Sequence, residues 1–253
     1  MDILEAFDIG LNVRELICFV GGGGKTTTMF AIAQALKSFN EKVLVTTSTH
    51  IFYPDPIKEK YDKIIINNSE EIGSFNGIDK STVTVFGSDV VNIVNGRKLS
   101  GPNKDFIGNL YEKLIFDYIL VECDGSKRKP IKAPADYEPV VPDNATKTIG
   151  VIGLDAIGNP INEEHVHRHE LLCNIVKRSP GEILDEEAVV NLILSPAGLF
   201  KGVPDGSERY VLLNKADDVQ RRKYAKSISA RLKEKKFLPK CIIAAIADNR
   251  LYS

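Results

Sequence analysis

Short apolar runs alternate along the chain with longer stretches whose apolar residues recur at helical spacing. Runs rich in Val and Ile are typical of strands that are buried on both faces of a parallel sheet. The predicted strands are Leu16–Val20, Lys42–Thr47, Lys63–Ile66, Thr82–Phe86, Asp117–Glu122, Lys147–Ile152, Arg209–Leu213 and Cys241–Ala245. The predicted helices are Lys25–Phe39, Asp105–Leu114, His167–Val176, Glu186–Leu194 and Asp218–Lys235. This alternation predicts an α/β fold with a doubly wound, mainly parallel sheet and helices on both faces.

The pattern predicts one domain over residues 1–253, with a helical insert at about 160–206. A stretch rich in Pro and Gly, residues 195–206, separates this insert from the strand that follows. Residues 125–144 are rich in Pro, Lys and Asp, which indicates a long functional loop. Ligands of such a sheet bind beyond the carboxyl ends of its strands, so site residues are expected there.

Composition narrows the function classes. The hydrophobic fraction of 43% and the charged fraction of 26% are ordinary for a globular protein. A net charge of -1 argues against nucleic-acid binding, and no apolar run is long enough to predict a membrane span. The first residues lack a basic region and a long apolar core, so we expect a cytoplasmic protein. The four cysteines are widely spaced and are expected to be reduced and mostly buried.

A glycine-rich run lies between the first predicted strand and the first predicted helix. It reads Gly21-Gly22-Gly23-Gly24-Lys25-Thr26-Thr27. Glycines let backbone N–H groups approach an anion closely, and the helix N-terminus adds partial positive charge. Lys25 is expected to reach the β- and γ-phosphates of a nucleotide, and the Thr26 hydroxyl to hold Mg²⁺. The run resembles the deviant phosphate loops of the SIMIBI class of P-loop NTPases, although Val20 stands where many of those proteins carry a lysine.

A second candidate motif ends the strand predicted at Asp117–Glu122. Glu122 and Asp124 follow a long apolar run, and Gly125 comes directly after them. Carboxylates in this place hold Mg²⁺ beside a nucleotide, usually through waters that the ion retains. We expect Lys25, Glu122 and Asp124 to be catalytic, and Gly125 to donate its N–H to the γ-phosphate. The alternative is a strand that ends in solvated acids.

A third motif, Asn214-Lys215-Ala216-Asp217, follows the strand predicted at Arg209–Leu213. It is the guanine-reading pattern of GTPases: the aspartate accepts from guanine N1–H and N2, the lysine stem packs on the base, and the asparagine braces the loop. Adenine cannot supply that pair of donors, so a buried aspartate would reject it. The alternative is a polar turn in which Asp217 caps the next helix.

Two polar segments are candidates for binding further groups. Residues 46–49, which all carry hydroxyl groups, lie at the end of the second strand and are expected at the edge that carries the glycine loop. Thr47 is the main candidate among them. They would bind phosphate, a Mg²⁺-bound water or an oxyanion, or else bond their own backbone. Lys127, Arg128, Lys129 and Lys132 follow the acidic strand end and would bind an anionic second substrate, or else form a solvated basic loop.

Together these stretches resemble the YqeC family of accessory proteins of selenium-dependent molybdenum hydroxylases. The resemblance is carried by residues 21–27, by Val45-Thr46-Thr47-Ser48-Thr49-His50-Ile51, by residues 122–134, and by Gly153-Leu154-Asp155-Ala156-Ile157-Gly158 continuing to Val166-His167-Arg168. The chain departs mildly at Cys123, where family members commonly have alanine. The resemblance implies a P-loop NTPase fold and a role in cofactor or selenium maturation. It also implies partners, namely a molybdenum cofactor or a client hydroxylase. The resemblance of the glycine loop to SIMIBI proteins, many of which act as dimers across the nucleotide, implies a homodimer.

Three functions follow from these motifs. The favoured one is a Mg²⁺-dependent nucleotide-binding hydrolase or switch, with GTP preferred, that acts as a maturation factor. The second is an ATP-dependent enzyme acting on a small anionic substrate. The third is a nucleotide-gated cofactor carrier with negligible turnover.

Overall fold

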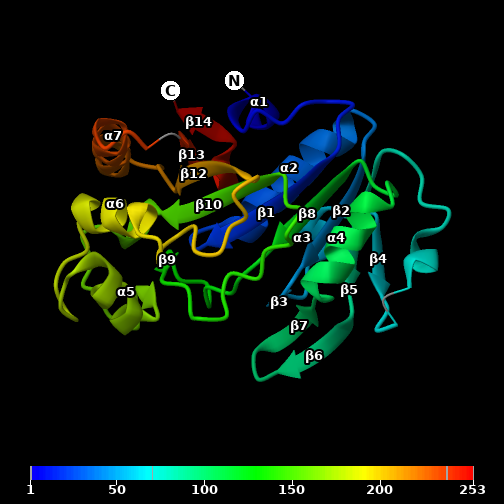
Figure 1. Cartoon of the computed structure of the whole chain (residues 1–253), viewed down its shortest axis with the longest axis horizontal. Coiled ribbons are helices and arrows are strands. Elements are labelled where there is room, and N and C mark those ends of the chain that lie inside the picture. The colour runs from blue at the N-terminus through cyan, green and yellow to red at the C-terminus, as the bar shows by residue number, and fades with distance from the viewer. Residues whose placement is uncertain (1, 70, 238, 253) are drawn as a thin grey trace.

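A large parallel sheet forms the centre of the molecule. The structure is a computed structural model that describes residues 2–69, 71–237 and 239–252. Within them, nine strands form one sheet in the order β14-β13-β12-β10-β1-β8-β2-β5-β4 (Figure 1). These strands are β1 (Glu15–Gly21), β2 (Lys42–Thr47), β4 (Lys63–Ile66), β5 (Thr82–Gly87), β8 (Tyr118–Glu122), β10 (Lys147–Gly153), β12 (Glu208–Asn214), β13 (Lys240–Ala245) and β14 (Arg250–Tyr252). Each neighbouring pair is parallel except β13 and β14, which confirms the predicted α/β sheet.

Helices cover both faces of this sheet. The helices are α1 (Ile3–Ala6), α2 (Lys25–Ser38), α3 (Pro56–Glu59), α4 (Lys104–Glu112), α5 (His169–Val176), α6 (Glu186–Leu194) and α7 (Val219–Glu234), with 3₁₀ turns at Ile72–Phe75, Leu154–Ala156 and Ile246–Asp248. One buried core joins the sheet to α4, α5, α6 and α7, and a second joins it to α1 and α2. The doubly wound arrangement is therefore confirmed.

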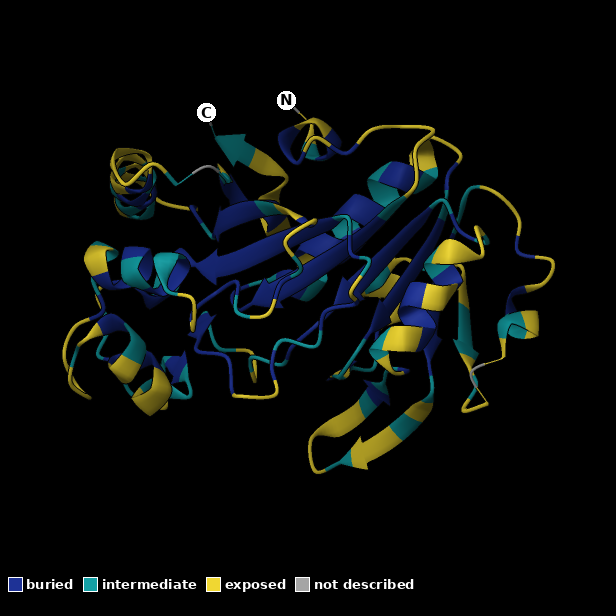
Figure 2. Cartoon of the chain, in the orientation of Figure 1, coloured by how far each residue is buried: buried dark blue, intermediate teal, exposed yellow. Residues whose placement is uncertain are grey.

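Strand β1 shows how one apolar run serves both cores. Side chains of successive residues in a strand point to opposite faces of the sheet. Ile17 and Phe19 belong to the core under α1 and α2, whereas Leu16 and Cys18 belong to the opposite core. All four are fully buried, which explains why the run is continuously apolar and does not alternate. Figure 2 shows the central strands of the sheet as buried.

A small second sheet extends the carboxyl edge of the large one and was not predicted. It contains β3 (His50–Phe52), β7 (Gly96–Ser100) and β6 (Asp89–Ile93) in that order. Because β3 follows β2 and β6 follows β5, this sheet stands beyond the carboxyl ends of those two strands. Figure 1 shows the β6–β7 hairpin projecting from the body of the molecule, and Figure 2 shows it as largely exposed.

One predicted helix begins later than expected. The prediction placed a helix over His167–Val176, but α5 starts at His169. Val166 and His167 instead form the short strand β11, which pairs in parallel with β9 (Ile131–Lys132). Arg168 then takes a left-handed conformation with φ of 61°, so the chain turns before the helix begins.

The cysteines behave as the sequence indicated. All four are free thiols, and Cys18, Cys123 and Cys173 are buried. Across the part of the chain that the structure describes, none of the helices combines the length and apolarity that crossing a membrane requires.

Candidate functional site

A cavity of about 920 Å³ lies beside the glycine loop, at the carboxyl edge of the large sheet. Its lining comes from segments that are far apart in the sequence. They are the start of α2, strand β3, the end of β8 with the loop that follows it, and parts of β6, β7 and β12–α7. A cleft at this edge is the expected place for a ligand of a doubly wound sheet.

The glycine loop joins β1 directly to α2. Gly23 and Gly24 have φ of 84° and 124°, conformations that side chains rarely adopt. A Cβ on Gly23 would lie 2.2 Å from the backbone nitrogen of Gly153, and one on Gly24 would lie 2.4 Å from Nδ2 of Asn214. Glycine is thus required at both positions by conformation and by the neighbouring strands β10 and β12.

Only part of this loop is available to an anion. The N–H of Gly21 donates to Asp124 Oδ2 at 3.0 Å, that of Gly22 to Val151 O at 2.9 Å, and that of Gly23 to Lys129 O at 3.2 Å. Within the described residues, the N–H groups of Gly24, Lys25 and Thr26 have no acceptor. The free donors are therefore those at the start of α2, where the helix dipole favours a negative charge.

Lys25 lies buried among oxygen atoms. Its Nζ is 2.5 Å from Gly21 O, 3.1 Å from Asp124 Oδ1 and 3.6 Å from Glu122 Oε1. Burial disfavours its charge, but Asp124 and Glu122 outweigh that effect and raise the pKa of Lys25. Burial also raises the pKa of Glu122, although Lys25 and Thr26 oppose this. Lys25 is consequently a charged ammonium group at the edge of the cavity.

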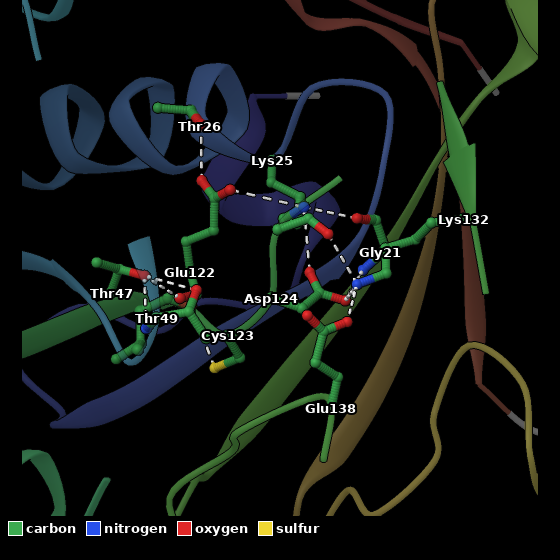
Figure 3. Close-up of polar contacts among 12 residues, drawn as sticks. Gly21, Lys25, Thr26, Thr47, Thr49, Glu122, Cys123, Asp124, Lys132 and Glu138 are labelled. Carbon is green, nitrogen blue, oxygen red and sulfur yellow. Dashed lines mark hydrogen bonds and ion pairs between the residues drawn. The ribbon is translucent and has the colours of Figure 1, made fainter. Parts of the chain in front are cut away.

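Thr26 and Glu122 form the second polar contact of the cavity. The Thr26 hydroxyl donates to Glu122 Oε2 at 2.6 Å (Figure 3). Both residues line the cavity. A hydroxyl and a carboxylate side by side are oxygen ligands that suit Mg²⁺. Within the described residues, no three His, Cys, Asp or Glu side chains gather as a metal site. A cation here would therefore depend on additional oxygens from water or a nucleotide.

Asp124 lies outside the cavity, in a chain of buried charges. Its carboxylate binds Lys25 on one side and Lys132 Nζ, at 3.1 Å, on the other. Lys132 also pairs with Glu138, which accepts from Arg168 at 2.6 and 3.0 Å. Figure 3 shows Lys132 between the two carboxylates. Burial raises the pKa of Glu138, but Arg168 and Lys132 outweigh it, so this pKa lies below its ordinary value.

Thr47 and Gly125 are also occupied by contacts within the protein. The buried Thr47 hydroxyl donates to Glu122 O at 2.7 Å and accepts from Thr49 N at 3.0 Å. Thr47 thus braces β8 against the end of β2. Gly125 lines the cavity, and its carbonyl accepts from Lys132 Nζ at 2.8 Å.

The Asn214–Asp217 motif is divided by the structure. Asn214 donates to Gly23 O at 2.9 Å and accepts from Ile246 N at 3.1 Å, so it braces the glycine loop. Lys215 lines the cavity and pairs with Asp155 at 2.6 Å. Asp217 is exposed and pairs with Arg221 at 2.8 Å. The cap of α7 is Asp218, so the alternative in which Asp217 caps this helix is wrong by one residue.

Several lining residues were not predicted. Phe52 and Lys98 come from the small sheet, and Glu138 lies late in the loop after β8. The dipeptide Asn95-Gly96 between two apolar stretches is a hairpin signal and could have revealed the β6–β7 hairpin that carries Lys98. The pairing of Glu138 with Arg168 has no sequence signal, because it joins residues from two separate loops.

Comparisons with known proteins place this site within a family-specific segment. The family model described as "YqeC protein" matches residues 17–170. The chain is also 31% identical over 212 residues to the Escherichia coli (strain K12) protein YqeC, which is described as uncharacterized. That similarity covers 82% of this chain and 79% of the relative. The glycine loop, Glu122, Asp124 and the basic loop all lie within the matched residues, whereas Asn214–Asp217 lies beyond them.

Proposed function

The chain belongs to the YqeC family, and on that premise we propose that it is a P-loop NTPase of the SIMIBI type. It binds a nucleoside triphosphate with Mg²⁺, GTP being favoured, and hydrolyses it or switches between its bound states. The observation that carries the proposal is the geometry of Lys25. A buried ammonium group lies at the end of a glycine loop, beside a cavity of about 920 Å³ and two carboxylates, one at the end of the adjacent strand β8 and one just beyond it.

The phosphates of the nucleotide would bind the free N–H groups at the start of α2 and the ammonium group of Lys25. The Thr26 hydroxyl and the Glu122 carboxylate would hold Mg²⁺, which neutralises charge on the phosphates when it is bound. Lys25 now contacts Glu122 and Asp124, so nucleotide binding requires it to exchange some of these contacts for phosphate oxygens. Lys132 keeps Asp124 paired during this exchange.

Asn214, Lys215 and Asp217 are the residues proposed to bind the nucleotide base. Asn214 and Lys215 lie against the glycine loop and the cavity, as a base-reading loop requires. The carboxylate of Asp217 is paired with Arg221 and would have to leave it to accept from guanine. Because this ion pair competes with guanine for the Asp217 carboxylate, ATP is the second candidate for the nucleotide. With ATP bound, the protein would act as an ATP-dependent enzyme on an anionic substrate.

The biological role follows from family resemblance alone. We propose that the protein assists the maturation of a selenium-dependent molybdenum hydroxylase, either by acting on its cofactor or by carrying that cofactor under nucleotide control. If the protein binds its partner with the same affinity in the presence of GTP and of GDP, the proposal of a nucleotide-controlled carrier is rejected.

Replacement of Lys25 tests the nucleotide site. We expect Lys25→Ala to weaken binding of a fluorescent GTP analogue by at least about tenfold, because charge-assisted hydrogen bonds contribute about 1.5–3 kcal/mol. The matched control is Lys37→Ala, which removes a lysine from the other end of α2, where it pairs with Asp62. Wild-type affinity in a folded Lys25→Ala protein would contradict the proposal.

Because Lys25→Ala removes the ammonium partner of the buried Glu122 and leaves Asp124 paired with Lys132 alone, that variant is at risk of misfolding. Thr26→Ala keeps all the charges and removes only the hydroxyl that contacts Glu122. We expect it to fold and to reduce the dependence of nucleotide binding on Mg²⁺. Unchanged Mg²⁺ dependence in this variant would remove Thr26 from the proposed cation site.

A further inference from the structure

The cavity beside the glycine loop has a second wall that the nucleotide proposal does not use. This wall contains Phe52 of β3, Lys98 of β7, and Lys127 and Arg128 from the loop after β8. Phe52 and Lys98 are register partners on adjacent strands. Arg128 places its guanidinium group 3.8 Å from the centre of the Phe52 ring, so three segments distant in sequence meet at one point.

The positive charges of this wall lack counter-charges. Within the described residues, no carboxylate lies at ion-pair distance from Lys98, Lys127 or Arg128. The other basic residues of the same loop differ in this respect. Lys132 is buried between Asp124 and Glu138, and Lys129 donates to Glu164 O at 2.6 Å. In this loop, Lys129 and Lys132 are therefore held by contacts within the protein, whereas Lys127 and Arg128 face the cavity.

The backbone holds two of these cations in an unfavourable conformation. Lys127 and Arg128 are consecutive non-glycine residues with φ of 49° and 62°. Left-handed conformations are strained for such residues and gather at ligand sites. Here they turn both side chains to the cavity side, and the stack on Phe52 restrains Arg128 there.

The geometry points to a binding site for an organic anion between the basic loop and the small sheet. Its ligand carries a phosphate or carboxylate group, which Lys98, Lys127 and Arg128 neutralise. It also has an apolar or aromatic portion, because Phe52, Val91, Ile93 and Tyr137 line the same cavity. This inference rests on the proposed function, since it makes the anion a second substrate held in the same cavity as the nucleotide. A cavity of about 920 Å³ is near the upper end of the range for ligand sites, about 300–1,000 Å³.

The test is a titration of the nucleotide-loaded protein, in which the glycine loop is already occupied. With Mg²⁺ and a non-hydrolysable GTP analogue at saturation, inorganic phosphate and succinate are added separately at constant ionic strength. Backbone amide shifts of residues 126–128 are followed by NMR. We expect saturable shifts with at least one probe, and the preferred probe identifies phosphate or carboxylate as the ligand group.

Two variants and one control locate the site. Lys98→Gln and Arg128→Gln should each weaken the preferred probe at least about fivefold, since each removes a charged hydrogen-bond donor. Lys80→Gln removes an exposed lysine outside this cavity and should have no effect. The inference is overturned if neither probe saturates, or if both variants bind it like the wild type. It is also overturned if Arg128→Gln weakens nucleotide binding instead, because Arg128 would then serve the γ-phosphate.

The anion site can also be tested if the protein does not bind nucleotides. If no nucleotide binds, the same probes are titrated into the wild-type protein without nucleotide. Saturable shifts at residues 126–128 that disappear in Arg128→Gln would then support the anion site without the nucleotide. Their absence would reject both.

Discussion

At the scale of single residues, the site is organised by alternating buried charges. Lys25, Asp124, Lys132, Glu138 and Arg168 form a continuous chain of ion pairs, and each central member has a partner on both sides. A buried charge is tolerated only when it is paired and hydrogen-bonded. This series of ion pairs therefore connects the loop after β8 and the start of α5 to the glycine loop.

His167 is next to this chain and responds to its charge. Burial, followed by the positive charges of Arg168, Lys132 and Lys127, lowers the pKa of His167 to about 4. In the unfolded chain the imidazole is protonated near pH 6.5, whereas in the folded protein it is protonated only near pH 4. The contribution to stability is thus complete above pH 6.5 and is lost as the pH falls toward 4.

We predict that the His167 imidazole titrates near pH 4 in the folded protein and near pH 6.5 in urea. Two-dimensional NMR of the imidazole protons measures both values. His167→Gln should accordingly flatten the fall in the free energy of unfolding between pH 6.5 and pH 4.5. A folded-state midpoint close to 6.5 would show that His167 is solvated and not surrounded by these cations.

At the scale of elements, the glycine loop depends on its two neighbours, β10 and β12. Gly24 has φ of 124°, and its missing side chain leaves room for Asn214, which holds Gly23 in place. Gly96, the first residue of β7, has a nearly equal φ of 126° but no atom within 4 Å of the position of a Cβ. The two glycines therefore differ in surroundings and not in backbone strain.

This difference makes Gly96→Ala a matched control for Gly24→Ala. Both should lose about 1–3 kcal/mol from backbone strain. Gly24→Ala should lose more, because Asn214 must move, and it should also weaken nucleotide binding. Urea unfolding and the fluorescent titration measure the two effects. Equal losses of stability together with unchanged nucleotide affinity would mean that Asn214 does not fix the loop.

Elements were predictable where one segment carries its own signal. The apolar run of β1 followed by glycines and a helical pattern located the loop, and Glu122 was found because it ends a buried strand. The two-residue strands β9 and β11 had no signal, because they exist only through pairing with each other. For the same reason, sequence could identify Lys127 to Lys132 as basic but could not tell that Lys132 is buried and Arg128 faces the cavity.

At the scale of the whole molecule, the fold brings five distant segments to one edge of the sheet. The glycine loop, the end of β8, the small sheet, the basic loop and the β12–α7 connection all meet at the cavity. The family model matches residues 17–170, so the first four segments lie within it and Asn214–Asp217 does not. Nucleotide binding and base preference are accordingly separate claims.

The most direct test of nucleotide binding is a calorimetric titration of the wild-type chain with non-hydrolysable GTP and ATP analogues in the presence of Mg²⁺. We expect one site per chain with micromolar or tighter affinity, a binding free energy of about -8 kcal/mol, and tighter binding of the GTP analogue. Tighter binding of the ATP analogue would overturn only the base assignment. The absence of saturable binding of either analogue at millimolar concentration would contradict the proposal that this protein binds nucleotides.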